Sequence, residues 1–308
     1  MQFMNKSKYF LYLSGAIVLV GIIIGLIFGG LNLGIDFTGG SILTVELGEQ
    51  YDTQVVQNAL TANGIDLNTT QIVKAGDDDT QAVIRMQEMS TDMDDATVRE
   101  SIIESLQATY PLAEGGEVES VGGVTTNEIV RNAFLAVLIA SAFMLVYIWI
   151  RFELFSGLAA LSALVHDVLI MTAVVTIFRV QINSSYIAAV LTIVGYSIND
   201  TIVLFDRIRE NNKKYSVSSK TRAQVADISI RETLSRTINT SVTTLVTILA
   251  LYIFGVASIR EFALPLIIGL ISGTYSSIFI ASPVWVKLMQ LKHKKDYKKL
   301  TEKVAKAK

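Results

Sequence analysis

The chain has 308 residues, of which 51% are hydrophobic and only 18% are charged, and its mean hydropathy is +0.47. This composition is typical of a membrane protein and excludes one large soluble domain. The net charge of −2 conceals a segregation, because acidic residues crowd the stretch from Asp36 to Glu128 whereas lysines and arginines crowd the two ends and one late segment. The lack of cysteine excludes disulfide bonds, thiolate metal sites and cysteine nucleophiles, and it leaves the redox compartment undecided.

The first predicted element is a transmembrane helix near the N-terminus. Residues 11–30 contain no charge and supply the roughly 20 apolar positions that a helix needs to cross a bilayer. Lys6 and Lys8 precede this run, as they would in a signal peptide, but the run exceeds the usual ~7 to 15 apolar residues and no A-x-A cleavage site follows. We therefore expect an uncleaved anchor, with residues 1–30 forming the N-terminus and the first span.

Residues 31–128 are predicted to form a small folded domain between the first and second spans. Their pattern alternates short half-buried strands with amphipathic helices. We expect strands at 42–47, 70–74, 82–87 and 117–121 and helices at 53–63 and 94–110. The order β-α-β-β-α-β predicts a ferredoxin-like α+β fold, an antiparallel sheet with two helices on one face. Asp77, Asp78 and Asp79 fall where the central hairpin turns, so we interpret them as a solvated turn rather than a metal site.

Five further apolar runs follow, and each is long enough to span as a helix. They occupy residues 133–150, 155–178, 182–205, 238–255 and 262–286. The sequence therefore predicts an α-helical multi-pass membrane protein with six transmembrane helices, of which helices 2–6 lie within residues 129–286.

The orientation follows from the basic residues, which concentrate on the cytoplasmic side of membrane proteins. Lys6 and Lys8, the segment 206–237 and the tail 287–308 are all basic. An even number of spans places these segments on one side, so we expect cytoplasmic termini, a cytoplasmic loop and an extracytoplasmic acidic domain. Within the loop, residues 220–235 fit either an amphipathic helix along the inner surface or a solvated loop.

Ionisable residues inside the predicted spans are the main candidates for function. Such groups cost roughly 2.5 to 3.5 kcal/mol on insertion scales, so they normally face the bundle interior or a water path. The third span contains His166 and Asp167, and the fourth contains Asp200 beside Asn199. Because His166 and Asp167 point about 100° apart on a helix, we do not expect both to address one partner helix. No span carries a nucleophile beside a catalytic base or ligands at zinc spacing, so neither an enzyme nor a metal site is expected.

Two polar stripes are predicted on the fourth and fifth helices, because residues three and four apart share a helix face. They consist of Thr192, Tyr196, Asn199 and Asp200 on the fourth helix and of Arg236, Thr240, Thr243 and Thr247 on the fifth. Since the two helices run in opposite directions, Asp200 and Arg236 both lie in the cytoplasmic third and are expected to meet. A proton relay, in which Asp200 alternates between pairing with Arg236 and taking up a proton, is favoured over a static pair, which apolar packing could replace at lower cost. Asn199, Asp167 and His166 are further candidates for this proton path.

Small residues at regular spacing predict close helix packing. The pattern G-x-x-x-G lets two helices approach closely in lipid. It involves Gly21, Gly25, Gly29, Gly269 and Gly273. We interpret these residues as packing positions rather than as chemical groups.

Several segments of the chain resemble one family. They are LGIDFTGG at residues 33–40, VHDV at 165–168, VGYSINDTIVLFDRIREN at 194–211 and SRTINTS at 235–241. By these motifs the chain is identified as a member of the SecF family, the smaller subunits of the bacterial SecDF protein-export complex within the RND-type transporter superfamily. The resemblance covers nearly the whole chain, including the six spans and the ferredoxin-like domain.

The resemblance implies a function and a set of partners. A SecF subunit works with SecD beside the SecYEG channel of the cytoplasmic membrane and uses the proton-motive force to draw preproteins outward. In the family, the aspartate of the N-D pair and an arginine on the next helix belong to the proton path, which assigns Asp200 and Arg236 to it. Six helices are half of an RND-type bundle, so SecD is expected to supply the other half, and whether the small subunit YajC also binds stays open. The resemblance implies membrane lipid around the spans, no nucleic acid, and no cofactor beyond the proton gradient.

Two other hypotheses stay open at this point. An RND-like exporter of small molecules or lipids would carry a large apolar outer cleft and two outer domains, whereas this chain has one small domain. An assembly factor that uses no energy would need Asp200 and Arg236 only to hold helices together.

Overall fold

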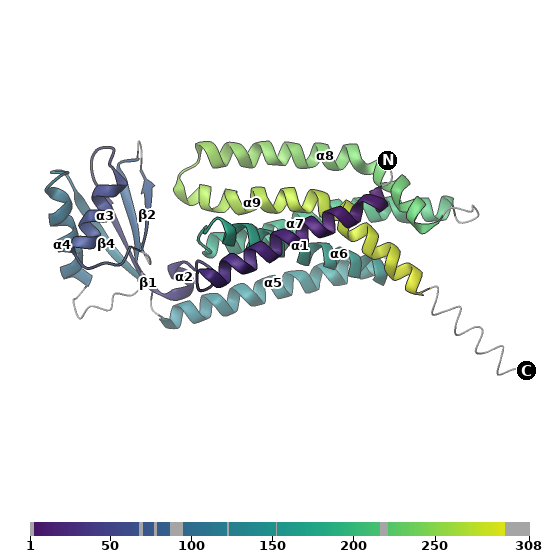
Figure 1. Cartoon of the computed structure of the whole chain (residues 1–308), viewed down its shortest axis with the longest axis horizontal. Helices are drawn as coiled ribbons and strands as arrows, with labels where there is room; N and C mark the ends of the chain where they lie inside the picture. Colours follow the sequence, from purple (N-terminus) through teal and green to yellow (C-terminus); the bar gives the residue numbers. More distant parts are fainter. Residues whose placement is uncertain are drawn as a thin grey trace, which may run out of the picture.

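The computed structural model of the protein describes residues 3–67, 70–76, 79–86, 95–121, 123–151, 153–215 and 221–292. A long bundle of helices carries a small sheet domain at one end (Figure 1). The expected turn at Asp77 and Asp78 and most of the basic tail lie outside the described residues.

Six helices in the described part of the chain are long and apolar enough to cross a membrane, which confirms the helical multi-pass class. They are α1 (Phe3–Ile27), α5 (Gly123–Arg151), α6 (Leu154–Ile177), α7 (Ser184–Lys214), α8 (Arg222–Phe254) and α9 (Ala257–Ser276). Helix α9 contains Pro265 and runs on through a π-helical turn, Ser277–Ala281, into a further helical stretch. The sixth candidate span is therefore Ile259–Lys292.

The segment 206–237, expected as the connection between the fourth and fifth spans, is helical over most of its described residues. Helices α7 and α8 extend into it from either side, and the helical alternative holds for α8. A capping box starts α8, because the Gln224 N–H donates to the Thr221 hydroxyl and the Thr221 N–H donates to the Gln224 side chain. Farther along α8, Glu232 accepts a hydrogen bond from Arg207 of α7 at 2.7 Å, so charged side chains hold the two extensions together.

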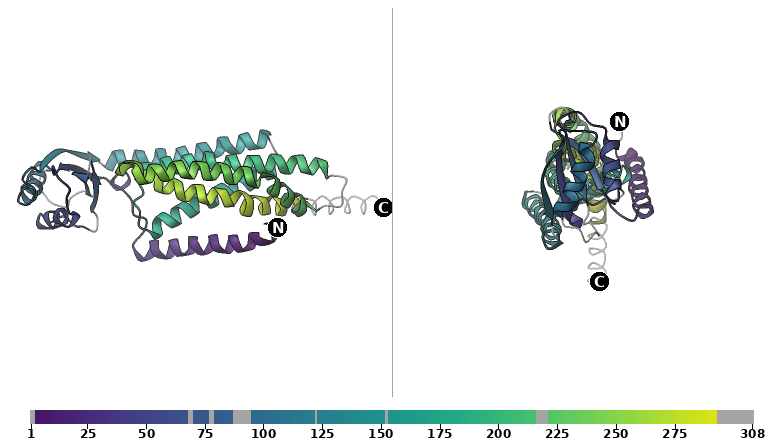
Figure 2. Two further views of the ribbon diagram at one scale, coloured as in Figure 1. Left: turned by 90° about the horizontal axis from the view of Figure 1, so that it is seen from above. Right: turned by 90° about the vertical axis from the view of Figure 1, so that its left-hand side faces the viewer.

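Helices α6, α7 and α9 form the centre of the bundle, with α1, α5 and α8 around them (Figures 1 and 2). Half or more of the apolar window of each central helix is buried (50%, 50% and 61%), against 11% or less for the outer three. Polar groups shared by the central helices are therefore enclosed by protein, whereas α8 carries both buried polar groups, such as Ser241, and exposed ones, such as Thr243.

The sheet domain follows a short helix, α2 (Ile35–Thr38). Its elements are β1 (Gly40–Glu46), α3 (Thr53–Ala62), β2 (Thr70–Ala75), β3 (Gln81–Met86), α4 (Asp95–Gln107) and β4 (Glu114–Val121), which is the expected order. Neighbouring strands are antiparallel, in the order β2-β3-β1-β4. Alternate residues such as Leu43, Val45 and Ile84 pack against α3 and α4 in one apolar core. The opposite face of the sheet, which carries Arg85, is turned toward the bundle (Figure 1).

Candidate functional site

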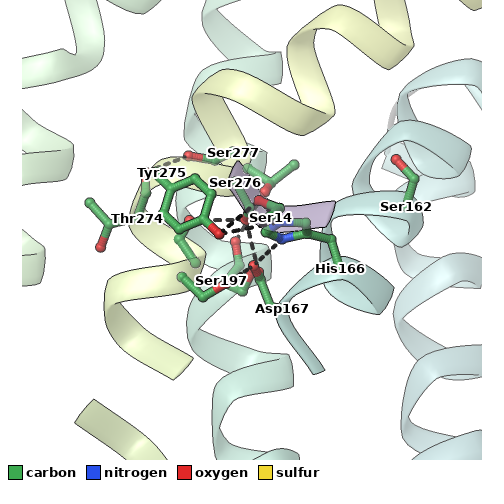
Figure 3. A network of polar contacts seen from close by, with 12 residues as sticks. Ser14, Ser162, His166, Asp167, Ser197, Thr274, Tyr275, Ser276 and Ser277 are labelled. Carbon is green, nitrogen blue, oxygen red and sulfur yellow. Dashed lines mark hydrogen bonds and ion pairs between the residues drawn. The ribbon is translucent and has the colours of Figure 1, made fainter. Parts of the chain in front are cut away.

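Asp167 lies at the centre of a buried polar cluster between α6, α7 and α9 (Figure 3). Its side chain is 0% exposed. One carboxylate oxygen, Oδ2, accepts hydrogen bonds from Ser197 Oγ at 2.5 Å and from Ser276 Oγ at 2.8 Å, and Oδ1 accepts one from Ser272 Oγ at 2.7 Å. The carboxylate of α6 thus accepts hydrogen bonds from side chains of α7 and α9. A polar group inside a membrane needs such partners.

His166 extends the same cluster to α1. Its Nδ1 lies 3.0 Å from Asp167 Oδ1, and its Nε2 lies 2.8 Å from Ser14 Oγ and 3.2 Å from Tyr275 OH. With Nδ1–H donating to the carboxylate, Nε2 is left as the acceptor for the two hydroxyls. The Tyr275 ring also meets the imidazole edge-on, with ring centroids 5.4 Å apart.

The expectation that His166 and Asp167 cannot both address one partner helix is wrong. Both reach α9, where Ser272, Tyr275 and Ser276 stand at positions i, i+3 and i+4 and therefore share one face. The His166 side chain reaches that face of α9 although its position on α6 is turned about 100° from that of Asp167. In the sequence, the only sign of this contact is the row of hydroxyl side chains on α9 at Ser272, Tyr275 and Ser276. That these hydroxyls meet Asp167 and His166 became visible only in the fold.

Asp200 lies on α7 in a sparser environment. It is 9% exposed, and in the described part of the chain Ser241 Oγ of α8 donates to Asp200 Oδ2 at 3.5 Å. Ser241 in turn accepts a hydrogen bond from Thr274 Oγ1 of α9 at 2.9 Å. At 3.5 Å the bond to the carboxylate is at the long limit, so this group is far less satisfied than Asp167.

Arg236 does not close the expected ion pair in this conformation. Its side chain is exposed, and among the described residues no salt bridge joins it to Asp200. Asn199, next to Asp200, is also exposed.

The two predicted polar stripes come together along one groove of about 350 Å³ between α7, α8 and α9. It is lined by Thr192, Tyr196, Thr243, Thr244, Thr247, Ile248, Phe262 and Leu266. Tyr196 precedes Asp200 by one helical turn, and Thr243 lies two residues from Ser241. Asp200 is not among the lining residues, and it lies about one helical turn from the groove along α7.

A second group of contacts joins the bundle to the sheet domain. Arg85 Nη1 on β3 lies 2.6 Å from Glu261 Oε1 at the start of α9. The other carboxylate oxygen of Glu261 accepts a hydrogen bond from Asn183 Nδ2 at 2.7 Å. Asn183 itself caps α7, since its side chain accepts from the Tyr186 N–H. One carboxylate thus ties the sheet to the first turns of two central helices.

Comparison with known proteins fixes the family. The family described as protein export membrane protein SecD/SecF, C-terminal, matches residues 101–291, and the SecD/SecF GG motif matches residues 24–50. The chain belongs to the SecD/SecF family.

Relatives within the SecD/SecF family match the chain along most of its length. The protein translocase subunit SecF of Alicyclobacillus acidocaldarius is 40% identical over 92% of this chain and 91% of its own. The protein translocase subunit SecDF of Bacillus subtilis is 36% identical over 96% of this chain. The crystal structure of SecDF from Thermus thermophilus, a translocon-associated membrane protein, superposes with a TM-score of 0.79 at 32% identity and covers 94% of this chain. This chain spans only 39% of either SecDF protein.

The GG motif of this SecD/SecF chain has a conformational cause. Gly39 and Gly40 join α2 to β1 with φ angles of 78° and 144°, a range that side-chain-bearing residues rarely adopt. Just before them, the Gly34 N–H donates to the Ile182 carbonyl at 2.8 Å, and a Cβ at Gly34 would lie 3.2 Å from Asn183 Cβ. The motif therefore seats the start of the sheet domain against the turn between α6 and α7.

The expected packing glycines of this SecD/SecF chain fall into two groups. Four lie against neighbouring helices: Gly21, Gly25, Gly269 and Gly273. A Cβ at Gly21, for example, would lie 2.8 Å from the Ala173 Cα of α6. Gly29 departs from the expectation, because it follows the end of α1 with φ 75° and has no neighbour within 4 Å of a Cβ. Its positive φ suits the turn that ends the helix rather than a helix contact.

Proposed function

We propose that the chain is a SecF-type subunit of a proton-driven protein-export complex in the cytoplasmic membrane. Its partners in this proposal are SecD, the SecYEG translocon and the preproteins in transit, with YajC as a further subunit to be tested. Family membership and the names of its relatives support a role in protein export. The observation that carries the proton-driven part is a buried, poorly satisfied carboxylate, Asp200, one helical turn along α7 from Tyr196, which lines a hydroxyl-rich groove.

A SecD partner is supported by the polar face that this chain leaves open. Tyr196 is 43% exposed, and Asn199, Arg236 and Thr243 are also exposed on α7 and α8. Such groups at membrane depth face a protein interior or water rather than lipid. This chain aligns with only 39% of the length of the SecDF relatives. A SecD half is therefore the partner best suited to cover that face.

The proton path in this proposal runs through Asp200 and Arg236, with Asn199 beside them. Water in the groove delivers a proton to the Asp200 carboxylate, and the neutral acid no longer attracts the Arg236 guanidinium. When the proton leaves toward the cytoplasm, the charged carboxylate attracts the guanidinium again. Each proton thus switches one attraction between α7 and α8 off and on, without a cofactor or an enzymatic step.

Asp167 and His166 take a supporting part in this path. Their cluster links α1, α6, α7 and α9, which are the helices that any shift beside Asp200 must displace or hold. We infer that the pair fixes the central helices, with a relayed proton at His166 as the alternative that the experiments below separate.

The sheet domain is proposed to be a ferredoxin-like domain on the extracytoplasmic side. Strand order β2-β3-β1-β4 and two helices on one face support the fold, and the basic opposite end of the bundle supports the orientation with both termini cytoplasmic. Glu261 would pass movements of α9 to this domain through Arg85.

Asp200→Asn tests the proton-driven function directly. The measurement is completion of preprotein translocation in membrane vesicles that contain the chain and its SecD, with and without a protonophore. We expect the protonophore to slow the wild type and to have no further effect on Asp200→Asn, which should already be at the uncoupled rate. Asp206→Asn, the same change at an exposed position farther along α7, is the matched control and should keep the response. If Asp200→Asn responds like the wild type while the complex stays assembled, the relay is wrong and a static assembly role replaces it.

A further inference from the structure

A cavity at the end of the bundle opposite the sheet domain combines an apolar floor with a basic rim. It has a volume of about 390 Å³ and lies where α6 begins, α7 ends, α8 begins and the sixth span ends. Its floor is formed by Phe205, Ile208, Trp285 and Met289, each of which is at most 5% exposed. A volume in this range suits a small ligand or part of a larger one.

The rim of the cavity gathers positive charge from two helices. Arg209 and Lys213 are one turn apart on α7 and so share a face. Arg222 enters from the first turn of α8, and its Nη1 donates to Asn212 Oδ1 at 3.0 Å, which holds the guanidinium at the rim. Glu153 is the one carboxylate among the lining residues. Among the residues that the structure describes, three cations and one carboxylate give the cavity lining a net charge of +2.

The position of the cavity relates it to the membrane surface. It sits at the ends of membrane-spanning helices, on the side where Lys6 and Lys8 also lie. An apolar floor below a cationic rim at this level matches a molecule with a phosphate above and hydrocarbon below.

We propose that this cavity binds the headgroup of an anionic phospholipid from the adjacent leaflet. The phosphate would bind among Arg209, Lys213 and Arg222, and the first part of the lipid chains would lie against Trp285 and Phe205. The site is independent of the proton path, because it shares no residue with Asp200, Arg236 or the groove. A bound lipid would brace the junction of α7 and α8, the two helices between which the proton path is proposed.

The placement of Trp285 allows a direct test. The chain has two tryptophans, and Trp149→Phe leaves Trp285 as the single tryptophan, which is excited selectively over the tyrosines at the red edge of the absorption band. The full chain with this change is placed in mixed micelles with brominated phosphatidylglycerol or with brominated phosphatidylcholine, whose bromines quench tryptophan on contact. Because three basic residues attract the lipid phosphate, we expect Trp285 to favour the anionic lipid by about tenfold or more.

Paired variants distinguish the cavity from general surface charge. Arg209→Gln with Arg222→Gln should remove the preference, and the Arg209→Lys with Arg222→Lys pair should retain most of it. Lys6→Gln with Lys8→Gln removes two exposed charges from the same end of the bundle and should leave the preference intact. Circular dichroism verifies that each variant keeps its helices.

Three results would overturn the proposal. The first is equal quenching by both lipids in the wild-type background. The second is an equal loss of preference in the cavity pair and in the Lys6 and Lys8 pair, which would indicate general surface charge. The third is loss of the preference on adding millimolar inorganic phosphate, which would indicate a site for a soluble anion.

Discussion

Asp167 and Asp200 are two buried carboxylates in the same membrane region, and the structure treats them differently. Asp167 is fully enclosed and accepts three serine hydroxyls at 2.5 to 2.8 Å as well as contacting His166. Asp200 has one hydroxyl at 3.5 Å and lies close to an open groove. A carboxylate whose acceptor sites are filled organises helices, whereas one with empty acceptor sites and access to water is free to exchange a proton.

The largest expected effect concerns the charge opposite Asp200. Arg236→Gln should reduce translocation to the rate seen with a protonophore, because without the guanidinium the carboxylate has no charge to release on protonation. Arg236→Lys keeps the positive charge but replaces the planar guanidinium with an ammonium group that has fewer N–H donors. This variant should retain part of the coupling. The check is the protonophore response in the vesicle assay. A full response in Arg236→Gln would show that Asp200 works without this partner.

The next effect concerns stability, for which Asp167 should matter more than Asp200. Asp167→Ala removes the acceptor of three hydroxyls and one imidazole, and at roughly 0.6 kcal/mol for each hydrogen bond in a membrane the free energy of unfolding should fall by about 2 kcal/mol. Asp200→Ala removes one long contact and should cost about 0.5 kcal/mol or less. Unfolding of the full chain in mixed micelles with added denaturing detergent measures both. Equal losses would remove the distinction between an organising and an exchanging carboxylate.

The sequence alone predicted the six spans and the sheet domain, because both depend on local patterns. Continuous apolar runs mark helices in lipid, and the alternation in residues 42–47 marks a strand with one buried face. Over 206–237 the sequence left a helix and a solvated loop open for residues 220–235, because charges that look solvated in the sequence can pair between helices, as Arg207 of α7 does with Glu232 of α8. The lengths of the two helical extensions therefore became visible only in the fold.

The candidate site was predictable only in part. Asp200, Asp167 and His166 stand out as ionisable residues within apolar runs. The acceptors and donors around Asp167 do not, because Ser272 and Ser276 are more than a hundred residues away and look like ordinary small residues of a packed helix. Which acid is saturated with hydrogen bonds depends on these distant contacts, so only the fold separates Asp167 from Asp200.

A smaller effect tests whether His166 relays protons or braces helices. His166→Gln loses the ring contact with Tyr275 and at least one of its hydrogen bonds to Ser14 and Asp167, so stability should fall by about 1 kcal/mol. If the cluster only braces the helices, the protonophore response should persist in this variant. Ser14→Ala, which removes the hydroxyl beside Nε2, is the control and should cost about 0.6 kcal/mol. If His166→Gln loses the protonophore response while its stability falls by no more than the expected amount, His166 belongs to the proton path.

The smallest expected stability change is at the contact between α9 and the sheet. This contact decides whether α9, which holds Asp167, passes movement to the outer domain. Helix α9 carries Ser272 and Ser276 in its middle and Glu261 at its start, about 16 Å from Ser272 along the helix. Arg85 and Glu261 are each 19% exposed, so Glu261→Gln should cost only about 0.5 to 1 kcal/mol.

If α9 transmits movement to the outer domain, Glu261→Gln should weaken proton-driven export more than its stability loss explains, and the charge swap Arg85→Glu with Glu261→Arg should recover part of it. Recovery stays partial because arginine at 261 cannot accept the hydrogen bond from Asn183. Export that is unchanged in Glu261→Gln would mean that the outer domain follows the bundle through other contacts at the base of the sheet, such as the hydrogen bonds from the Gly34 N–H to the Ile182 carbonyl and from the Ser184 N–H to Asp36. In that case the ordering of Asp167 by α9 would concern stability alone, and the coupling would belong wholly to α7, α8 and Asp200.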